Sequence, residues 1–180
     1  MILFTHRIPD TKKLLCAAAL VFMIFHGHSV AAMDVAVTIA PLKFFVAAIA
    51  GPEARVAVLV PPGADPHTFE MKPSSLRRVA SASCMVIVGS GIEFERTWIA
   101  KIIASCGNVP VIDCSRGVNV IGNDPHIWLA PGNAKQIART ITEGFSRIAP
   151  ERKPIYERHC AALCAKIDSL DASIHRVLSA

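Results

Sequence analysis

The sequence lacks several features that define common classes of protein. Its N-terminal apolar run, Leu14 to Phe25, is about a dozen residues long, whereas a membrane-spanning helix needs roughly 20. It has no C-x-x-C pattern and no low-complexity tract, and its only internal repeat is one three-residue element. The net charge of +5 is too small to indicate a nucleic-acid or membrane partner. These absences argue against a membrane anchor, a cysteine-rich zinc module and a nucleic-acid-binding protein.

Signatures of catalysis are also missing. The chain has no Gly-x-Ser-x-Gly elbow, and Gly89-Ser90-Gly91 is too short for a phosphate loop. His67 and Glu70 form H-x-x-E, but in a proline-containing loop rather than on the helix that a His-Glu-x-x-His site requires. A zinc hydrolase needs three protein ligands, an open coordination position and a general base. We therefore predict that the protein is not an enzyme.

Residues 1–32 have the pattern of a secretory signal peptide. A basic start precedes the apolar run, and the small residues Ser29 to Ala32 offer a cleavage site. Only two leucines separate Cys16 from Lys13, so no apolar run stands ahead of Cys16 to make a lipoprotein signal. We expect export to the periplasm and removal of the signal. Cleavage removes three basic residues and one acidic residue, which leaves a net charge of about +3.

Five cysteines remain after the predicted cleavage: Cys84, Cys106, Cys114, Cys160 and Cys164. Because the number is odd, at least one is unpaired within a monomer, even in a compartment that oxidises thiols. Cys106 and Cys114 are close enough for a loop-closing disulfide, although we favour buried free thiols. Cys160 and Cys164, with His159 beside them, share a helix face that could hold a soft metal, but helix packing is the preferred interpretation.

The order of elements predicts an α/β fold. Four apolar, β-branched runs are typical of buried parallel strands: Val35 to Ala40, Val56 to Val60, Met85 to Val88 and Val109 to Ile112. Three helices are expected between them, at Leu42 to Ala50, Ser75 to Ala82 and Phe94 to Cys106. Residues 33–132 are therefore predicted to form one lobe, a parallel four-stranded sheet flanked by helices.

Residues 133–180 are predicted to be helical throughout. A first amphipathic stretch runs to Ile148, and prolines at 150 and 154 interrupt the pattern. A second has apolar residues spaced alternately four and three apart: Tyr156, Cys160, Leu163, Ile167, Leu170, Ile174 and Val177. This stripe needs a partner surface, which could be the α/β lobe, a second domain or the same helix in a dimer.

Two copies of Asp-Pro-His, ending at His67 and His126, are the strongest functional signal. Proline stiffens each loop, and each loop follows a predicted strand, so both can reach the carboxyl edge of the sheet where α/β proteins bind ligands. We predict that His67 and His126 bind a metal; the alternative is that backbone groups satisfy them. Asp65 and Glu70 are candidate acceptors for the imidazole N–H groups, although we favour the alternative that they are solvated loop charges. His159 and His175 are predicted to be solvated.

Several motifs together resemble a known family. Pro61-Pro62-Gly63-Ala64-Asp65-Pro66-His67-Thr68-Phe69-Glu70, then Asp124-Pro125-His126-Ile127-Trp128, following a signal and Val35 to Leu42, are similar to the periplasmic metal-binding receptors of zinc and manganese ABC importers. Gly89 to Trp98, with Gly91 and Glu93, also resembles this family at its third helix.

The resemblance implies two α/β lobes joined by a long helix, with the metal between them. It implies that the first lobe supplies His67 and His126, while the second lobe supplies a histidine or glutamate and an aspartate. On this basis Glu151 to Leu178 is the linking helix, and we expect the second lobe to be absent from the chain. The resemblance also implies a permease in the inner membrane as partner, with a separate second lobe or a homodimer as further possibilities.

The ligand types favour zinc. Zinc prefers four ligands, so two imidazoles leave the remaining positions to water. Imidazole suits zinc better than manganese, which prefers more oxygen, so Zn²⁺ is expected and Mn²⁺ is the alternative. We predict an extracytoplasmic receptor that captures a divalent metal for an ABC importer. The alternative is a degenerate or split lobe without a complete metal site, acting only as a packing or dimerisation module.

Overall fold

A computed structural model describes residues 32–179 of the chain. All but the last residue of the predicted signal peptide, residues 1–32, therefore lies outside the described part. None of the helices in the described part is both long enough and apolar enough to span a bilayer.

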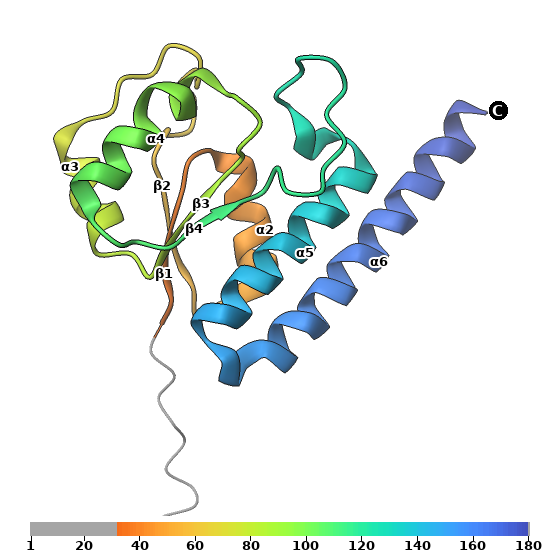
Figure 1. The fold of residues 1–180 in the computed structure, drawn as a ribbon. Coiled ribbons are helices and arrows are strands. Elements are labelled where there is room, and N and C mark those ends of the chain that lie inside the picture. The colour runs from red at the N-terminus through yellow and green to blue at the C-terminus, as the bar shows by residue number, and fades with distance from the viewer. Residues whose placement is uncertain (1–31, 180) are drawn as a thin grey trace, which may run out of the picture. The chain divides into compact units, whose positions relative to one another are not determined.

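The core of the fold is a four-stranded parallel sheet, as predicted. Its strands are β1 (Asp34–Val37), β2 (Arg55–Val58), β3 (Cys84–Ile87) and β4 (Val111–Asp113). Their order is β2-β1-β3-β4, and all three neighbouring pairs are parallel. The two central strands are almost completely buried, whereas the edge strands are partly exposed. Because the strands are parallel, their carboxyl ends share one edge of the sheet, at the top of Figure 1.

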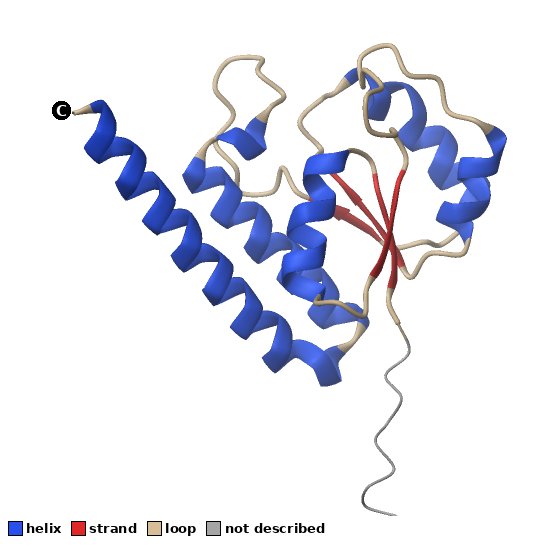
Figure 2. Cartoon of the chain, turned by 180° about the vertical axis from the view of Figure 1, so that it is seen from behind, coloured by secondary structure: helices blue, strands red, loops and turns tan. Residues whose placement is uncertain are grey.

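Helices cover both faces of the sheet (Figures 1 and 2). Helices α3 (Pro73–Ala80) and α4 (Glu93–Cys106) lie on one face, and α2 (Ala40–Ala50) lies on the other with the later helices. The first strand ends before the predicted Ala40 because α2 begins at Ala40, with Pro41 in its first turn, where a missing N–H costs nothing. Proline likewise begins α3 two residues earlier than predicted.

Helix α5 (Pro131–Ile148) packs on the same face as α2, after a short 3₁₀ turn at Ile127–Leu129. Its predicted apolar stripe is confirmed, since Ile137, Ile141 and Phe145 are completely buried. A Cβ on Gly144 would lie 2.4 Å from Cδ1 of Ile112 in β4, so only glycine allows α5 to approach the sheet this closely.

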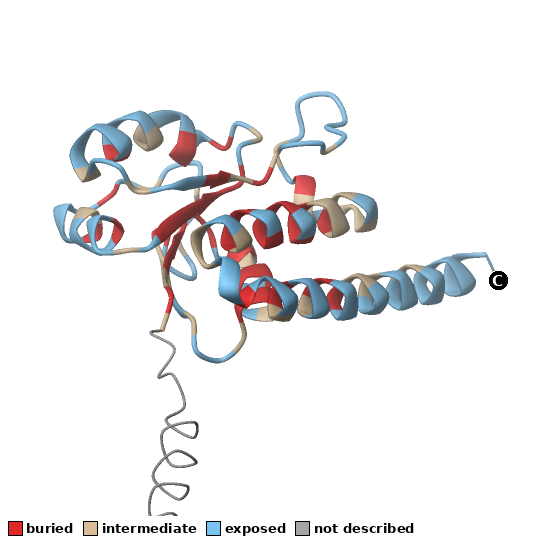
Figure 3. Cartoon of the chain, turned by 60° about the horizontal axis from the view of Figure 1, so that its bottom comes forward, coloured by how far each residue is buried: buried red, intermediate tan, exposed pale blue. Residues whose placement is uncertain are grey.

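The helix predicted as the linker is the long helix α6 (Lys153–Leu178). It starts two residues later than predicted because Pro150–Arg152 forms a separate 3₁₀ turn, and Pro154 sits in its first turn. Its stripe is buried against α2 and α5 only at the beginning, through Tyr156, Cys160 and Leu163. Further along, Leu170 and Val177 are 61% and 75% exposed, as the pale outer half of α6 in Figure 3 shows. The lobe therefore covers one half of the predicted stripe and leaves the other half bare.

Two sequence-based interpretations concern polar groups near these helices. All five cysteines in residues 32–179 are free thiols, and Cys114, which could have bridged to Cys106, is buried. The prediction that His159 is solvated is wrong. Its Nδ1 lies 2.9 Å from the carbonyl oxygen of Ile49, and the ring is half-buried, because α6 packs directly on the end of α2.

Candidate metal site

The two Asp-Pro-His loops meet above the carboxyl edge of the sheet. One follows β2 and the other follows β4, which are the two edge strands and lie three strand spacings, or roughly 14 Å, apart. Despite this, the ring centroids of His67 and His126 are only 6.1 Å apart. The fold therefore brings together the two histidines that the sequence singled out.

Each loop has the same local structure because it has the same three residues. The Asp65 carboxylate accepts a hydrogen bond from the His67 backbone N–H at 2.9 Å, and the Asp124 carboxylate accepts one from His126 at 3.0 Å. An aspartate forms this kind of turn with the backbone two residues ahead. The proline between the aspartate and the histidine has a fixed φ angle, which stiffens the turn. The repeated motif is thus a repeated turn that presents a histidine.

The imidazoles are oriented by carboxylates, but not by the candidates Asp65 and Glu70. His67 Nδ1 lies 2.6 Å from Glu93 at the start of α4, and His126 Nδ1 lies 2.7 Å from Asp124. Asp65 and Glu70 do not accept the ring N–H groups, which was the less favoured of the two interpretations for these carboxylates. Asp65 is occupied by the loop backbone, and the first turn of α4 places Glu93 closer to the ring. Sequence spacing gave no signal for Glu93, which is 26 residues from His67.

These contacts fix the tautomer of both rings. A carboxylate at this distance only accepts a hydrogen bond, so a neutral imidazole must carry its proton on Nδ1. The lone pair is then on Nε2, which is the atom left for a metal. A carboxylate behind a histidine in this way is the arrangement that orients metal-ligating imidazoles in other proteins.

Both orienting carboxyl groups have lowered pKa values. The pKa of Glu93 is lowered by its own backbone N–H at the start of α4 and then by the hydrogen bond from His67. The pKa of Asp124 is lowered by the backbone N–H and then by the ring N–H of His126. Both groups are consequently ionised at neutral pH, which is the state that holds the imidazoles as Nδ1–H tautomers.

The separation of the rings fits a shared ion. A zinc–nitrogen distance of about 2 Å puts each ring centre about 3 Å from the ion, so two rings that share it have centroids about 5 Å apart at a tetrahedral angle and about 6 Å apart at most. The observed 6.1 Å is at the upper end of this range, so closing by about 1 Å gives tetrahedral geometry. Both rings border a cavity of about 190 Å³ that is lined mainly by apolar residues, including Pro61, Ile92 and Trp128.

The aromatic residues that follow each histidine have different roles. Trp128 packs edge-on against His126, with ring centroids 5.3 Å apart. Phe69 packs instead against Phe94 of α4, with centroids 6.0 Å apart, and so anchors the first loop to that helix.

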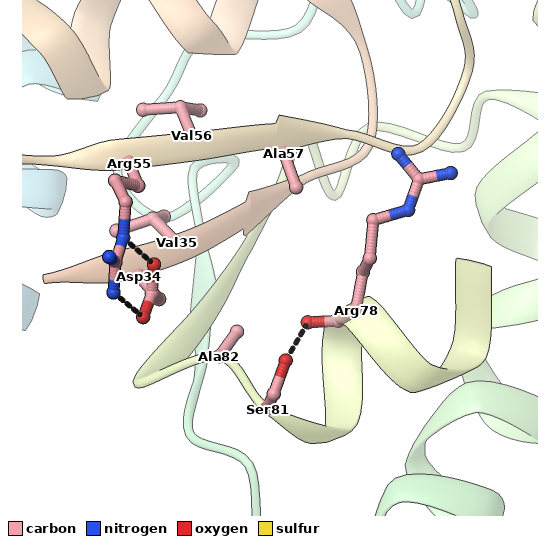
Figure 4. Close-up of a pocket in the computed structure, with 8 residues that line it drawn as sticks. All are labelled: Asp34, Val35, Arg55, Val56, Ala57, Arg78, Ser81 and Ala82. Carbon is pink, nitrogen blue, oxygen red and sulfur yellow. Dashed lines mark hydrogen bonds and ion pairs between the residues drawn. The ribbon is translucent and has the colours of Figure 1, made fainter. Parts of the chain in front are cut away.

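His67 and His126 are the two candidate ligands in this cavity. Within residues 32–179, no group of three or more histidine, cysteine or acidic side chains is arranged to hold a metal ion. A second pocket, at the amino edge of the sheet, is drawn in Figure 4. There Arg55 donates two hydrogen bonds to Asp34, at 2.6 and 2.7 Å, and the lining contains no histidine or cysteine. That pocket therefore offers no metal site.

Comparisons with known proteins show which family the chain resembles. Residues 35–180 match the family described as zinc-uptake complex component A, periplasmic (ZnuA). A putative metal-binding protein of Chlamydia muridarum is 33% identical over 165 residues, which are 86% of this chain and 57% of the relative. The manganese-binding lipoprotein MntA of Halalkalibacterium halodurans is 27% identical over 71% of this chain and 43% of its own.

A solved structure shows the same fold. The crystal structure of ZnuA superposes with a TM-score of 0.76 at 36% identity, covering 82% of this chain and 59% of the other. The chain spans about half the length of the curated relatives that it matches.

Proposed function

This chain belongs to the family of periplasmic zinc-uptake components, and we propose that it is the metal-capturing lobe of a receptor for an ABC importer. The proposal rests on the two imidazoles, whose Nδ1 atoms are held by carboxylates and whose ring centroids are 6.1 Å apart. In this arrangement both Nε2 atoms would bind one ion. Orientation of this kind serves metal binding and is not needed for packing. The lobe would act outside the inner membrane and pass its cargo to a permease.

Zinc is the cargo that the ligands favour. Two neutral imidazoles suit zinc, whereas manganese prefers more oxygen ligands than these loops supply. With two protein ligands, the remaining positions fall to water or to a second polypeptide surface. The affinity of the lobe alone should therefore be well below that of a site with four protein ligands, and manganese should bind more weakly than zinc.

A matched set of variants tests this proposal. The purified chain would be titrated calorimetrically with Zn²⁺ and then Mn²⁺, beside His67→Ala/His126→Ala and the control His175→Ala. His175 is an exposed histidine on α6, 3.6 Å from Asp171, and is not part of the loops. We expect zinc binding to be lost in the double variant and retained in the control. Equal zinc binding by all three proteins would refute the site.

A second candidate function is packing against another polypeptide, and the bare half of α6 favours it. Leu170 and Ile174 border an apolar groove of about 390 Å³, together with the exposed side chains of Phe44 and Leu129. An apolar surface of this kind fits a second lobe or a second copy of the chain. The groove also contains Trp128, which contacts His126, so a polypeptide bound there would lie beside the metal site.

Sedimentation velocity over a range of concentrations tests the packing function. A dimer that dissociates on dilution, and that Leu170→Glu/Ile174→Glu abolishes, would support pairing of two copies. A monomer at all concentrations would leave a separate second lobe as the partner, and its binding should be lost in the same variant. If Leu170→Glu/Ile174→Glu changes neither self-association nor binding of a second lobe, the groove is excluded as an interface.

A further inference from the structure

The two histidine loops come from opposite edges of the sheet, so a structural element between them must set their separation. Within residues 32–179, no hydrogen bond joins the two loops directly. Both are instead bonded to the segment 88–95, which follows the central strand β3 and leads into α4. This segment lies between the loops because β3 is a central strand of the sheet.

The segment donates a hydrogen bond to the proline carbonyl of each Asp-Pro-His motif. The Phe94 backbone N–H donates to the carbonyl oxygen of Pro66 at 3.1 Å, directly before His67. The Ser90 hydroxyl donates to the carbonyl oxygen of Pro125 at 2.5 Å, directly before His126. Two residues of one segment, Ser90 and Phe94, therefore fix the residue that precedes each histidine. The same segment supplies Glu93 to the His67 ring.

Glu95 attaches this segment to the sheet. Its side chain is only 5% exposed and accepts hydrogen bonds from the backbone N–H groups of Val88 and Gly89, at 2.7 and 2.8 Å. It also accepts one from the hydroxyl of Thr38, directly beyond β1. A single carboxylate thus joins the carboxyl ends of β1 and β3 to the first turn of α4.

We propose that Glu95 is a positioning residue for the metal site, and that it sets the separation of His67 and His126 through the segment Ser90–Glu95. This inference rests on the proposed function, because it assigns a role in metal binding to a residue that touches no metal. The contact chain runs from Glu95 to both loops, so loosening it should displace both imidazoles together. Loosening the Ser90 contact should displace only His126.

Glutamine at position 95 disrupts this anchor with almost no change in volume. All three partners of Glu95 are donors, and a glutamine side chain has one acceptor oxygen and one NH₂ donor. One buried backbone N–H would then face another donor, so that contact must open. Ser90→Ala removes only a hydroxyl from a half-buried position, and Ser90→Thr restores the hydroxyl.

The test reads the imidazole nitrogens of the metal-free protein by long-range ¹H–¹⁵N NMR, and then the zinc dissociation constant. In Glu95→Gln, we expect the nitrogen signals of both histidines to shift because both rings are displaced, and zinc affinity to fall at least about tenfold. In Ser90→Ala, only His126 should shift, and Ser90→Thr should reverse the change. The control is Glu53→Gln, which breaks an ion pair with Arg152 at the opposite end of the sheet and should shift neither ring.

The outcomes separate this inference from the proposed function. A lower melting temperature in Glu95→Gln with unchanged histidine signals would mean that Glu95 only stabilises the fold, which would overturn the inference. If Glu95→Gln does not fold, a Ser90→Ala spectrum with an unaltered His126 overturns it equally. Shifted rings in a protein that binds no zinc would uphold the contact chain and refute the metal-binding function instead.

Discussion

Replacing Glu93 by glutamine tests whether the carboxylate behind His67 contributes to metal binding. The carboxylate accepts the Nδ1–H of His67 at 2.6 Å, and in metal sites such partners are worth about 10–100-fold in affinity. The lower end of that range applies here for two reasons. Glutamine retains one oxygen that can accept the same hydrogen bond, and the two side chains are 41% and 51% exposed, so solvent screens the lost charge.

We therefore expect Glu93→Gln to raise the zinc dissociation constant about tenfold, with Tm nearly unchanged. Competition with a chromophoric chelator would measure the zinc dissociation constant. Glu70→Gln is the matched control, because it removes the same charge at the end of the His67 loop. Glu70 makes no hydrogen bond to the His67 ring. A dissociation constant within about twofold of the parent protein would refute the role of Glu93. An equal loss in both variants would show that net charge, not orientation of His67, is responsible.

Three further predictions concern the lobe that supports the site. Phe145→Ala should lower the free energy of unfolding by about 3–5 kcal/mol in urea denaturation, because its buried ring packs on Tyr156 at 5.6 Å and would leave a cavity; a cost below about 1 kcal/mol would contradict this packing. Gly89→Ala should lower the free energy of unfolding by more than about 1 kcal/mol in the same assay. Gly89 has φ +76°, and a Cβ there would lie 1.8 Å from Oδ1 of Asp113. Burial raises the pKa of the Cys84 thiol to about 12, so iodoacetamide at pH 8 should leave it unmodified in the folded protein and alkylate it after denaturation, as mass spectrometry of peptides would show.

The sheet was predictable because its central strands are buried on both faces. Burial of that kind requires uninterrupted apolar runs, such as Met85 to Val88, and these are visible in the sequence. The ends of the elements were less predictable. Helix α2 begins at Ala40, two residues before its apolar pattern, since Pro41 fits the first turn of a helix. Pro150 starts a separate turn before α6. The apolar stripe of α6 showed that a partner surface is needed, but not that the lobe covers only half of it.

The site was predictable only in part. Proline-stiffened turns are local, so the sequence alone singled out His67 and His126, and the strand order explains why they meet. The partners of the rings depend on tertiary structure. Glu93 reaches His67 because α4 begins beside the first loop, and Glu95 reaches two strands because it is buried beneath the segment that enters α4. Neither contact follows from spacing along the chain.

The central claim is that Nε2 of His67 and Nε2 of His126 bind the same ion. The most direct measurement is a zinc titration followed through the imidazole ¹⁵N signals of both residues. The account predicts that the two Nε2 signals shift together and stop shifting at one equivalent of zinc, while both Nδ1 atoms remain protonated. Shifts in only one of the two rings, or saturation at two equivalents, would contradict a shared metal site.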